Sequence, residues 1–392
     1  MSKPIHTYLD LDVLNNNLTS TTVAPQLRFE EIRNTPFLEG DSSDYFCSIV
    51  RFSIQTGNSL PIFIPRIETG QSDIDKTVYK VTLTWKITDT LSDTYTASVL
   101  HITSDDTATM PHDPKDSQDM SGTYYYHYNV QTIVKMLNTA LSSAWDGLLA
   151  LIPYSDEAGP GELPDVFRAT YIPYFEFDSD KYRLVLNIDK DFCNGGYWAG
   201  RYVGSVYLNT RFYELLSGMP SNRISRIGDS NYEVVPDTSS TKSIKRADGS
   251  TSTLYQTFQE ISSMAMWNPV ASIVFCTGQL PIVSTNTSPP LTYDDTSNNN
   301  LTSNGNNSNL SSILSDFEIP VSETNQYRPI IVYNPSSEYR LVDMHSSTSL
   351  NKIDITVFWK THFGDFIPLR LQPGCAAHIK LMFRHKTFYL GY

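Results

Sequence analysis

The segment "IDITVFWKTHFGDFIPLRLQPGCAAHIKLMFRHK", residues 353–386, contains two runs in which apolar and polar side chains alternate. Alternation with a period of two residues predicts β-strands that bury one face. The apolar positions that share a face are Ile353, Ile355, Val357 and Trp359 in the first run and Ala377, Ile379, Leu381 and Phe383 in the second. The segment therefore predicts the two closing strands of a fold built from β-strands.

The same segment also raises the alternative of an enzyme or a metal site. It holds five side chains common in such sites: His362, Asp365, Cys375, His378 and His385. Cys375 and His378 are three residues apart and point to opposite faces of a strand, which disfavours a nucleophile with its base. His362 and Asp365 flank Gly364, which predicts a turn, and a metal site needs more ligands nearby. We therefore interpret His362, Asp365, Cys375 and His378 as turn residues and outward-facing side chains.

Other patterns of catalytic and cofactor sites are lacking from the sequence. It contains no GxSxG, HExxH, HxH, GxGxxG or GxxxxGK[ST] motif. Asp343 and His345 share a strand face if residues 339–345 are extended, which allows a surface pair. The sequence thus predicts no catalytic, cofactor-binding or metal-ligating residue and no cofactor, and we expect the protein not to be an enzyme.

Composition and charge limit the class of protein further. The 392 residues are 40% hydrophobic and include 24 tyrosines and 18 phenylalanines, which favours a large core and strand structure. The net charge is −13 and the densest basic run is "KSIKRADG" at 242–249, so nucleic-acid binding is not expected as the main function. Four distant cysteines predict neither a zinc site nor a disulfide framework. The start has no signal-peptide core and no apolar run reaches membrane-spanning length, so we expect a soluble protein from a reducing compartment, without a membrane partner.

Further strands are predicted outward from the closing segment. In "CSIVRFSIQT" (47–56), Val50, Phe52 and Ile54 alternate with polar residues, and "VYKVTLTWKIT" (78–88) alternates throughout its length. In an eight-stranded jelly roll the first and last strands pair, as do the second and the seventh. We therefore expect residues 47–56 to pair with 377–386, and residues 78–88 to pair with 353–360.

Two helices interrupt the strand pattern. Residues 129–145 carry apolar side chains at helical spacing, which predicts a helix with one buried face. Residues 209–220 combine Asn209 or Thr210 as an N-cap with Gly218 after the last turn, which predicts a second, shorter helix.

The pattern as a whole predicts an all-β fold, a single jelly-roll sandwich with an inserted second domain and two short helices. Residues 1–44 are aperiodic and are interpreted as an extended N-terminal arm. Residues 45–392 then form the jelly roll, with an insertion somewhere within about 105–310. Residues 284–312 are rich in Asn, Ser and Thr and are expected to form a long exposed loop.

The sequence also resembles a known family. Four pieces carry the resemblance in order: "YYYHYNVQTIVKMLNTAL", "VYLNTRFYELLSGMP", "MWNPVASIVFCTGQLPI" and "YRLVDMHSSTSLNKIDITVFWKTHFGDFIPLRLQPGCAAHIKLMF". Together they span much of residues 120–385. In these pieces the chain is similar to the penton, or minor capsid, proteins of double-stranded DNA viruses of the virophage and polinton group.

The resemblance implies a structural capsid protein of an icosahedral virion. Members of this family are single jelly rolls that stand five around each vertex as a homopentamer, with an inserted domain extending outward. Trimers of the major capsid protein surround them, a host receptor is a possible further partner, and no catalytic residues carry over. The alternative is a glycan- or receptor-binding jelly-roll module, in which tyrosines of "TYYYHY" (123–128) stack on sugar rings.

Overall fold

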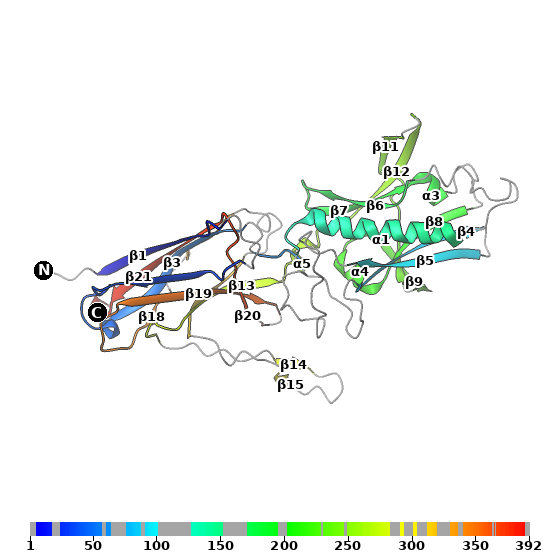
Figure 1. Ribbon diagram of the computed structural model, residues 1–392. Coiled ribbons are helices and arrows are strands. Elements are labelled where there is room, and N and C mark those ends of the chain that lie inside the picture. The colour runs from blue at the N-terminus through cyan, green and yellow to red at the C-terminus, as the bar shows by residue number, and fades with distance from the viewer. Residues whose placement is uncertain are drawn as a thin grey trace. The chain divides into compact units, whose positions relative to one another are not determined.

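The protein is described from a computed structural model. The described residues are 5–17, 24–56, 60–63, 76–87, 91–100, 127–151, 171–194, 202–228, 230–246, 249–282, 291–293, 301–303, 312–319, 330–335, 340–362, 364 and 366–388. The chain divides into two compact units (Figure 1). The sandwich unit comprises Met1–Pro61 and Pro269–Tyr392, and the central unit comprises Ile62–Asn268. The sequence predicts an insertion within about residues 105–310. The central unit begins earlier, at Ile62, and ends at Asn268.

The sandwich unit consists of two antiparallel sheets. The first has the order β1–β21–β3–β17, with β18 also paired to β3, and its strands are β1 (His6–Leu14), β21 (Ala376–His385), β3 (Tyr45–Gln55), β17 (Ile330–Tyr333) and β18 (Val342–Asp343). The second has the order β16–β13–β19–β2, with β20 also paired to β19, and its strands are β16 (Ser312–Glu318), β13 (Val270–Thr277), β19 (Lys352–Thr361), β2 (Arg28–Ile32) and β20 (Phe366–Pro368). Short 3-10 turns lie at Ser42–Asp44 and Lys386–Phe388.

The order of these strands along the chain makes the sandwich a jelly roll. β1 pairs with β21 and β2 pairs with β19, so the first strand meets the last, and the second meets the last long strand before it. β3 lies on the other side of β21, as Figure 1 shows. The predicted all-β jelly-roll fold is therefore confirmed.

The core of the sandwich unit is a group of aromatic rings between the two sheets. The ring of Phe52 on β3 is fully buried and lies 4.9 Å from that of Phe275 on β13, edge to face. The ring of Phe317 on β16 lies 5.8 Å from Phe275 and stacks on Tyr333 of β17 at 4.2 Å. Because β3 and β17 belong to one sheet and β13 and β16 to the other, these rings hold the sheets face to face.

The closing strands bury the faces that the sequence predicted. All eight apolar positions are 2% exposed or less: Ile353, Ile355, Val357, Trp359, Ala377, Ile379, Leu381 and Phe383. In β3, Phe52 and Ile54 are buried as predicted, but Val50 is only half-buried. A β-bulge explains the difference, because the register of β21 passes from Arg51 to Ile49 and leaves Val50 without a partner position.

One predicted strand pairing is confirmed and the other is wrong. Residues 47–56 and 377–386 do pair, as β3 and β21, although β3 is the third strand of the jelly roll and not the first. Residues 78–87 belong to the central unit, in β4 (Lys76–Ile87), which pairs with β5 (Leu91–Leu100) and β8 (Tyr202–Leu208) and not with β19; residue 88 lies outside the described residues. Alternation identifies the two faces of a strand but does not identify its partner.

The N-terminal arm predicted for residues 1–44 is also corrected. Residues 6–14 form β1 and residues 28–32 form β2, one in each sheet of the sandwich. Leu9, Leu11 and Val13 alternate with aspartates in β1, so the period of two was present but short. These two strands are the first and second strands that the jelly roll requires.

The predicted loop at 284–312 contains some regular structure. β14 (Leu291–Tyr293) and β15 (Leu301–Ser303) pair as a two-stranded antiparallel ribbon. Ser312 already belongs to β16. Residues 283–290, 294–300 and 304–311 lie outside the described residues.

The central unit contains two antiparallel sheets and a long helix. One sheet has the order β5–β4–β8–β10–β9, with β5 (Leu91–Leu100), β8 (Tyr202–Leu208), β10 (Ser230–Val234) and β9 (Ser221–Ile227) beside β4. The other has the order β11–β12–β7–β6, with β11 (Thr241–Lys245), β12 (Thr251–Phe258), β7 (Arg183–Asp189) and β6 (Tyr174–Asp178). The helices are α1 (Val130–Leu151), α3 (Lys190–Asn194), α4 (Thr210–Leu215) and α5 (Met264–Trp267).

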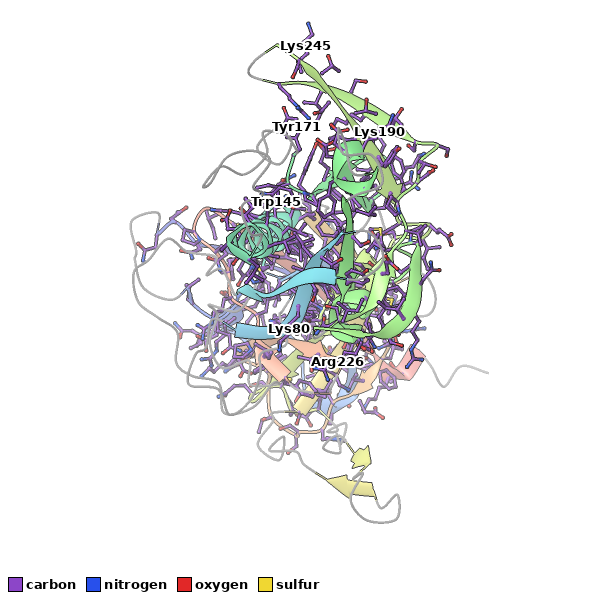
Figure 2. The ribbon with its side chains drawn as sticks, turned by 90° about the vertical axis from the view of Figure 1, so that its right-hand side faces the viewer. Lys80, Trp145, Tyr171, Lys190, Arg226 and Lys245 are labelled. Atoms are coloured by element: carbon purple, nitrogen blue, oxygen red, sulfur yellow. The ribbon has the colours of Figure 1, made fainter. Side chains whose placement is uncertain are left out.

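Helix α1 confirms the first predicted helix and extends it to 22 residues. The predicted apolar stripe is buried: Val130, Ile133, Val134, Leu137 and Leu141. The helix packs against β4 and β5 of one sheet and against β6 of the other. Trp145, labelled in Figure 2, lies towards the C-terminal half of the helix. Its buried ring lies 5.6 Å from that of Phe192 on α3. Helix α1 therefore joins the two sheets of the central unit.

Helix α4 confirms the second predicted helix and its signals. The side chain of Asn209 accepts a hydrogen bond from the backbone N–H of Phe212 at 2.9 Å, as an N-cap does. Gly218 has φ +90°, the left-handed conformation expected after a helix end. A Cβ there would also lie 3.0 Å from the backbone oxygen of Ile261.

Asn138 of α1 covers the open edge of β6. Its Nδ2 donates to the backbone oxygen of Phe175 at 3.0 Å, and the backbone N–H of Phe175 donates to its Oδ1 at 2.7 Å. The replacement Asn138→Ala removes both partners of Phe175, and we expect it to lower the free energy of unfolding of the central unit by about 1–2 kcal/mol. Urea denaturation followed by circular dichroism measures this change.

The adjacent residue provides a matched control. Thr139 is exposed, and its hydroxyl donates only to the carbonyl of Lys135 within the same helix. Thr139→Ala is expected to change the free energy of unfolding by less than about 0.5 kcal/mol. Equal effects of the two substitutions would show that the contact with β6 contributes nothing beyond helix propensity.

Candidate functional surface

The side chains of the first sandwich sheet that point away from the core form a charged surface. Two cross-strand rows build it, because directly paired residues share a face. Asp10, Lys380 and Arg51 lie opposite one another on β1, β21 and β3, and Asp12, His378, Ser53 and Val332 form the next row, which reaches β17. We call Asp10, Asp12, Arg51, His378 and Lys380 the charged face.

Ion pairs link the strands across the charged face. Oδ1 of Asp10 lies 3.4 Å from Nη2 of Arg51, and its Oδ2 lies 3.3 Å from Nζ of Lys380. Oδ1 of Asp12 lies 2.6 Å from Nδ1 of His378. The aspartate side chains are 50% and 71% exposed, so water and salt screen these pairs. Each pair is therefore weak alone, and Asp10 is shared by two of the three pairs.

The charged face is shallow and has apolar margins. A depression on it is lined by Asp10, Asp12, Arg51, Ser53, Val332 and His378. Beside it, Tyr8, Leu14, Ile330 and Val332 are each about half exposed. An open surface that mixes paired charges with exposed apolar groups is suited to contact with another protein.

The structure separates the side chains that suggested a nucleophile with its base. Cys375 lies in the turn before β21, and burial raises the pKa of its thiol. His378 points outward from β21 and contacts Asp12 of β1. His362 is exposed directly after β19, and Asp365 lies outside the described residues.

The remaining candidates have structural partners. His385 is buried, its ring lies 4.9 Å from that of Tyr45, edge to face, and its Nδ1 is 2.7 Å from the hydroxyl of Thr387. The Asp343 carboxylate contacts Nζ of Lys386 at 2.9 Å. His345 is exposed, and its backbone N–H donates to the carbonyl of Pro281 at 2.6 Å.

The other thiols lie in apolar surroundings. Burial raises the pKa of Cys47, Cys193 and Cys276 to about 12, so they are protonated at neutral pH. The four cysteines are all among the described residues and none forms a disulfide. Within the described ranges, no group of three or more His, Cys, Asp or Glu side chains could hold a metal ion. No helix in the same part of the chain is long and apolar enough to cross a membrane.

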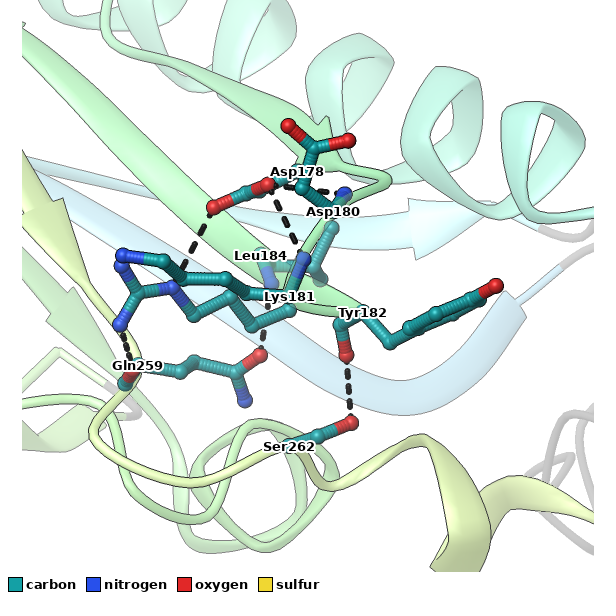
Figure 3. Close-up of polar contacts among 8 residues, drawn as sticks. Asp178, Asp180, Lys181, Tyr182, Leu184, Gln259 and Ser262 are labelled. Atoms are coloured by element: carbon teal, nitrogen blue, oxygen red, sulfur yellow. Dashed lines mark hydrogen bonds and ion pairs between the residues drawn. The ribbon is translucent and has the colours of Figure 1, made fainter. Parts of the chain in front are cut away.

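A polar network fixes the turn between β6 and β7 in the central unit (Figure 3). Asp178 accepts hydrogen bonds from two backbone N–H groups of the turn, and Tyr182 has a φ of 48°. The hydroxyl of Ser262 donates to the carbonyl of Tyr182. Oε1 of Gln259 accepts from the backbone N–H of Leu184 at 2.8 Å. These bonds hold the turn against the segment after β12, and we assign them a structural role.

A buried charge lies at the end of β7. Burial raises the pKa of Asp189, although its carboxylate accepts from the backbone N–H groups of Tyr171 at 3.0 Å and Asp191 at 2.8 Å. Nη2 of Arg246 lies 3.5 Å from the same carboxylate. The sequence showed no sign of this pair, because Asp189 ends β7 and Arg246 follows β11, far apart in the chain.

The tyrosine run that suggested a sugar platform is mostly outside the described residues. Residues 123–126 fall in that part. His127 is fully buried against Phe63, with ring centroids 5.8 Å apart, and Tyr128 is half-buried. The described end of the run is thus part of the core of the central unit.

Comparison with known proteins relates both units to viral capsid proteins. A family model described as Sputnik minor capsid protein V18/19 matches residues 7–385. The uncharacterized protein V18 of Sputnik virophage is 33% identical over 116 residues, which are 28% of this chain and 65% of V18. The match thus spans slightly less than two thirds of the length of that relative.

Two solved structures share the fold over nearly the whole chain. A chain in the cryo-EM structure of the Sputnik virophage superimposes with a TM-score of 0.68, at 20% identity, and covers 99% of both chains. The crystal structure of the mavirus penton protein superimposes with a TM-score of 0.56, at 13% identity, and covers 97% of this chain and 99% of that one. At these identities the likeness concerns the fold.

The family match over residues 7–385, together with the jelly-roll fold, defines a viral capsid protein. The chain belongs to the Sputnik minor capsid protein V18/19 family. The resemblance seen in the sequence is thereby confirmed, and the protein is a component of the virion.

Proposed function

We propose that this protein forms the five-fold vertices of an icosahedral capsid as a homopentamer, surrounded by trimers of the major capsid protein. The observation that carries the proposal is the shared fold of both units with the mavirus penton protein, over 97% of this chain. Family membership independently supports a role in the capsid. A ring of five requires two different contact surfaces on each subunit, because the association is heterologous and closes on itself.

We further propose that the two units have different roles at the vertex. The sandwich unit is the part that joins the shell, and the central unit is a domain inserted between β3 and β13 that extends outward. The division of the chain into Met1–Pro61 with Pro269–Tyr392 and Ile62–Asn268 supports this assignment. The rings of Phe63 and Trp267, near the two ends of the central unit, lie 6.1 Å apart, as expected where a domain is inserted at one point.

The protein acts in this proposal by assembly and not by catalysis. The side chains that suggested a catalytic site are distributed among a turn, an ion pair and a buried ring contact. Three of the four thiols have a pKa of about 12, which removes the thiolate that a cysteine nucleophile needs. Capsid proteins are the partners, and the net charge of −13 does not favour the genome as one.

The experiment is to determine the mass and symmetry of the assembly. The purified full chain of 44.3 kDa is examined by native mass spectrometry, alone and with the major capsid protein, and particles are imaged by cryo-EM. We expect five copies in one complex and density of this chain at the vertices. A stable trimer, or density confined to the faces of the shell, would contradict the proposal.

A further inference from the structure

The second sheet of the sandwich carries its own charged row on the side that points away from the core. Lys360 of β19 lies opposite Phe366 of β20 and Ser272 of β13, and Ser272 lies opposite Glu318 of β16. Trp359, the residue before Lys360, is buried in the core, so the side chain of Lys360 points outward. We call Phe366, Lys360, Ser272 and Glu318 the second-sheet row.

This row and the charged face lie near the same end of the sandwich unit. Ser53, in the row of the charged face that includes Asp12, is two residues before the end of β3, after which the chain enters the central unit. Lys360 is one residue before the end of β19, whose last residue, Thr361, pairs with Val270 at the start of β13. Since β13 directly follows the central unit, both rows are next to the end at which that unit is inserted.

The charges of the second-sheet row are not paired within the described part of the chain. No described acidic side chain forms an ion pair with Lys360, whose ammonium lies 5.7 Å from the ring centroid of Phe366. Glu318 is exposed and likewise forms no ion pair within the described ranges. The strand of Ser272 separates Lys360 from Glu318 by two strand spacings, about 10 Å. Both charges are therefore available to another molecule.

The order of charges on the two sides of the sandwich is complementary. β1 contacts β2 at one edge of the sandwich, and an aromatic stack joins β17 to β16 at the other. From the first edge to the second, the charged face carries Asp12 on β1 and then Arg51 on β3. In the same direction, the second-sheet row carries Lys360 on β19 and then Glu318 on β16. The signs on the two sides are thus opposite.

Apolar side chains accompany the charges at the same edge. Leu14 follows Asp12 by two residues on the same side of β1 and is 57% exposed. Phe366 is half-buried beside Lys360. A contact between the two sides would cover these apolar groups and would also join opposite charges, a composition typical of protein interfaces.

A ring of five brings one side of each subunit against a different side of the next. When the insertion end points outward, rotation about the five-fold axis keeps every level and every edge in place. The first sheet of one copy then faces the second sheet of its neighbour, with the β1 edge of one beside the β2 edge of the other.

Building on the proposed function, we propose that the partner of the charged face is a second copy of this chain. Asp12 of one subunit contacts Lys360 of its neighbour, and Leu14 packs against Phe366. Arg51 faces Glu318 in the same contact. The surface that looked like a site in a single chain thereby becomes one half of the contact that closes the pentamer.

The test reverses the two charges in the full chain at physiological ionic strength. Asp12→Lys and Lys360→Asp each place like charges at all five contacts. Native mass spectrometry and sedimentation velocity are expected to show that each raises the concentration at which half of the chain is pentameric by about tenfold or more. In the double variant D12K/K360D opposite charges meet again, and this concentration is expected to return to within about threefold of that of the unmodified chain.

The control variant is Asp343→Lys, at the other end of the first sheet. Asp343 is 51% exposed, contacts Lys386 at 2.9 Å and lies opposite Phe46 at the start of β3. Its reversal therefore removes a comparable ion pair away from the proposed contact, and assembly is expected to stay unchanged. Amide hydrogen exchange of β19 and β21 checks that each variant remains folded. Lys360→Asp breaks no described ion pair within the chain, so it retains the fold even where Asp12→Lys weakens it.

Each outcome has a definite meaning. Single variants that assemble at the same concentration as the unmodified chain would overturn the proposal. A double variant as defective as the single ones would do the same, because the two residues would then not meet. Single variants that form pentamers but fail to enter particles would assign the charged face to another capsid protein. An unmodified chain that forms no pentamer would contradict the proposed function itself, which distinguishes that failure from the others.

Discussion

The replacement Phe52→Ala is expected to lower the free energy of unfolding of the sandwich unit by about 3–5 kcal/mol. The ring is fully buried between the sheets, 4.9 Å from Phe275 and 5.9 Å from Phe317. Its removal leaves a cavity that the surrounding rings cannot fill without leaving their own contacts. Amide hydrogen exchange of β13 and β19 during denaturant titration measures the stability of this unit separately from that of the central unit.

The control for Phe52 lies at the edge of the same sheet. Val332 on β17 is 55% exposed and points away from the core. Val332→Ala is expected to change the free energy of unfolding by less than about 0.5 kcal/mol. If Phe52→Ala cost no more than this control, the face-to-face packing of the two sheets would be refuted.

The second large effect is expected at Gly204 of β8. A Cβ at this position would lie 2.3 to 2.5 Å from three ring atoms of Phe192 on α3. Phe192 is fully buried and touches Trp145, so it cannot turn aside. We expect Gly204→Val to destabilise the central unit by about 3 kcal/mol or more, measured by thermal unfolding.

A double substitution separates this overlap from the loss of glycine itself. In Gly204→Val with Phe192→Ala, the added methyl groups can occupy the space of the missing ring. We expect the double variant to be more stable than the sum of the two single effects by about 1–3 kcal/mol. Additive effects would contradict the assigned contact, and Ser205→Val, on the opposite side of the strand, controls for β-branching.

The parts of the fold that the sequence predicted correctly are those governed by local periodicity. Ile353 to Trp359 and Ala377 to Phe383 alternate cleanly, and both buried faces are confirmed. Asn209 and Gly218 mark the ends of α4 as N-cap and C-terminal glycine. These signals depend on backbone geometry within a few residues, so they can be read without knowledge of the tertiary fold.

The wrong pairing of residues 78–88 has a different cause. Their alternation predicts a strand, and β4 is one, but the choice of partner depends on which sheet the chain has entered. Interpreting residues 1–44 as an arm leaves β1 and β2 out of the expected strand order of the jelly roll. The strand taken as the second of the jelly roll therefore belongs to the central unit.

The charged face could not be predicted, because it is assembled from distant parts of the chain. Asp12 and His378 are separated by 366 positions, and only the register of β1 against β21 brings them to 2.6 Å. A weak local signal existed in the alternation of Asp10 and Asp12 with leucines, which indicates the outer face of a strand. The sequence correctly indicated that His378 points outward but did not indicate its partner.

The pairing of β1 with β21 has a consequence for synthesis of the protein. His6 pairs with Arg384, so β1 cannot complete its pairing until residue 384 has left the ribosome. The central unit is complete much earlier and can fold while β1, β2 and β3 are still unpaired. Aspartates in β1 suit this interval, since charge on an unpaired strand discourages association between nascent chains. The jelly roll is therefore expected to close only after β21 has been synthesised.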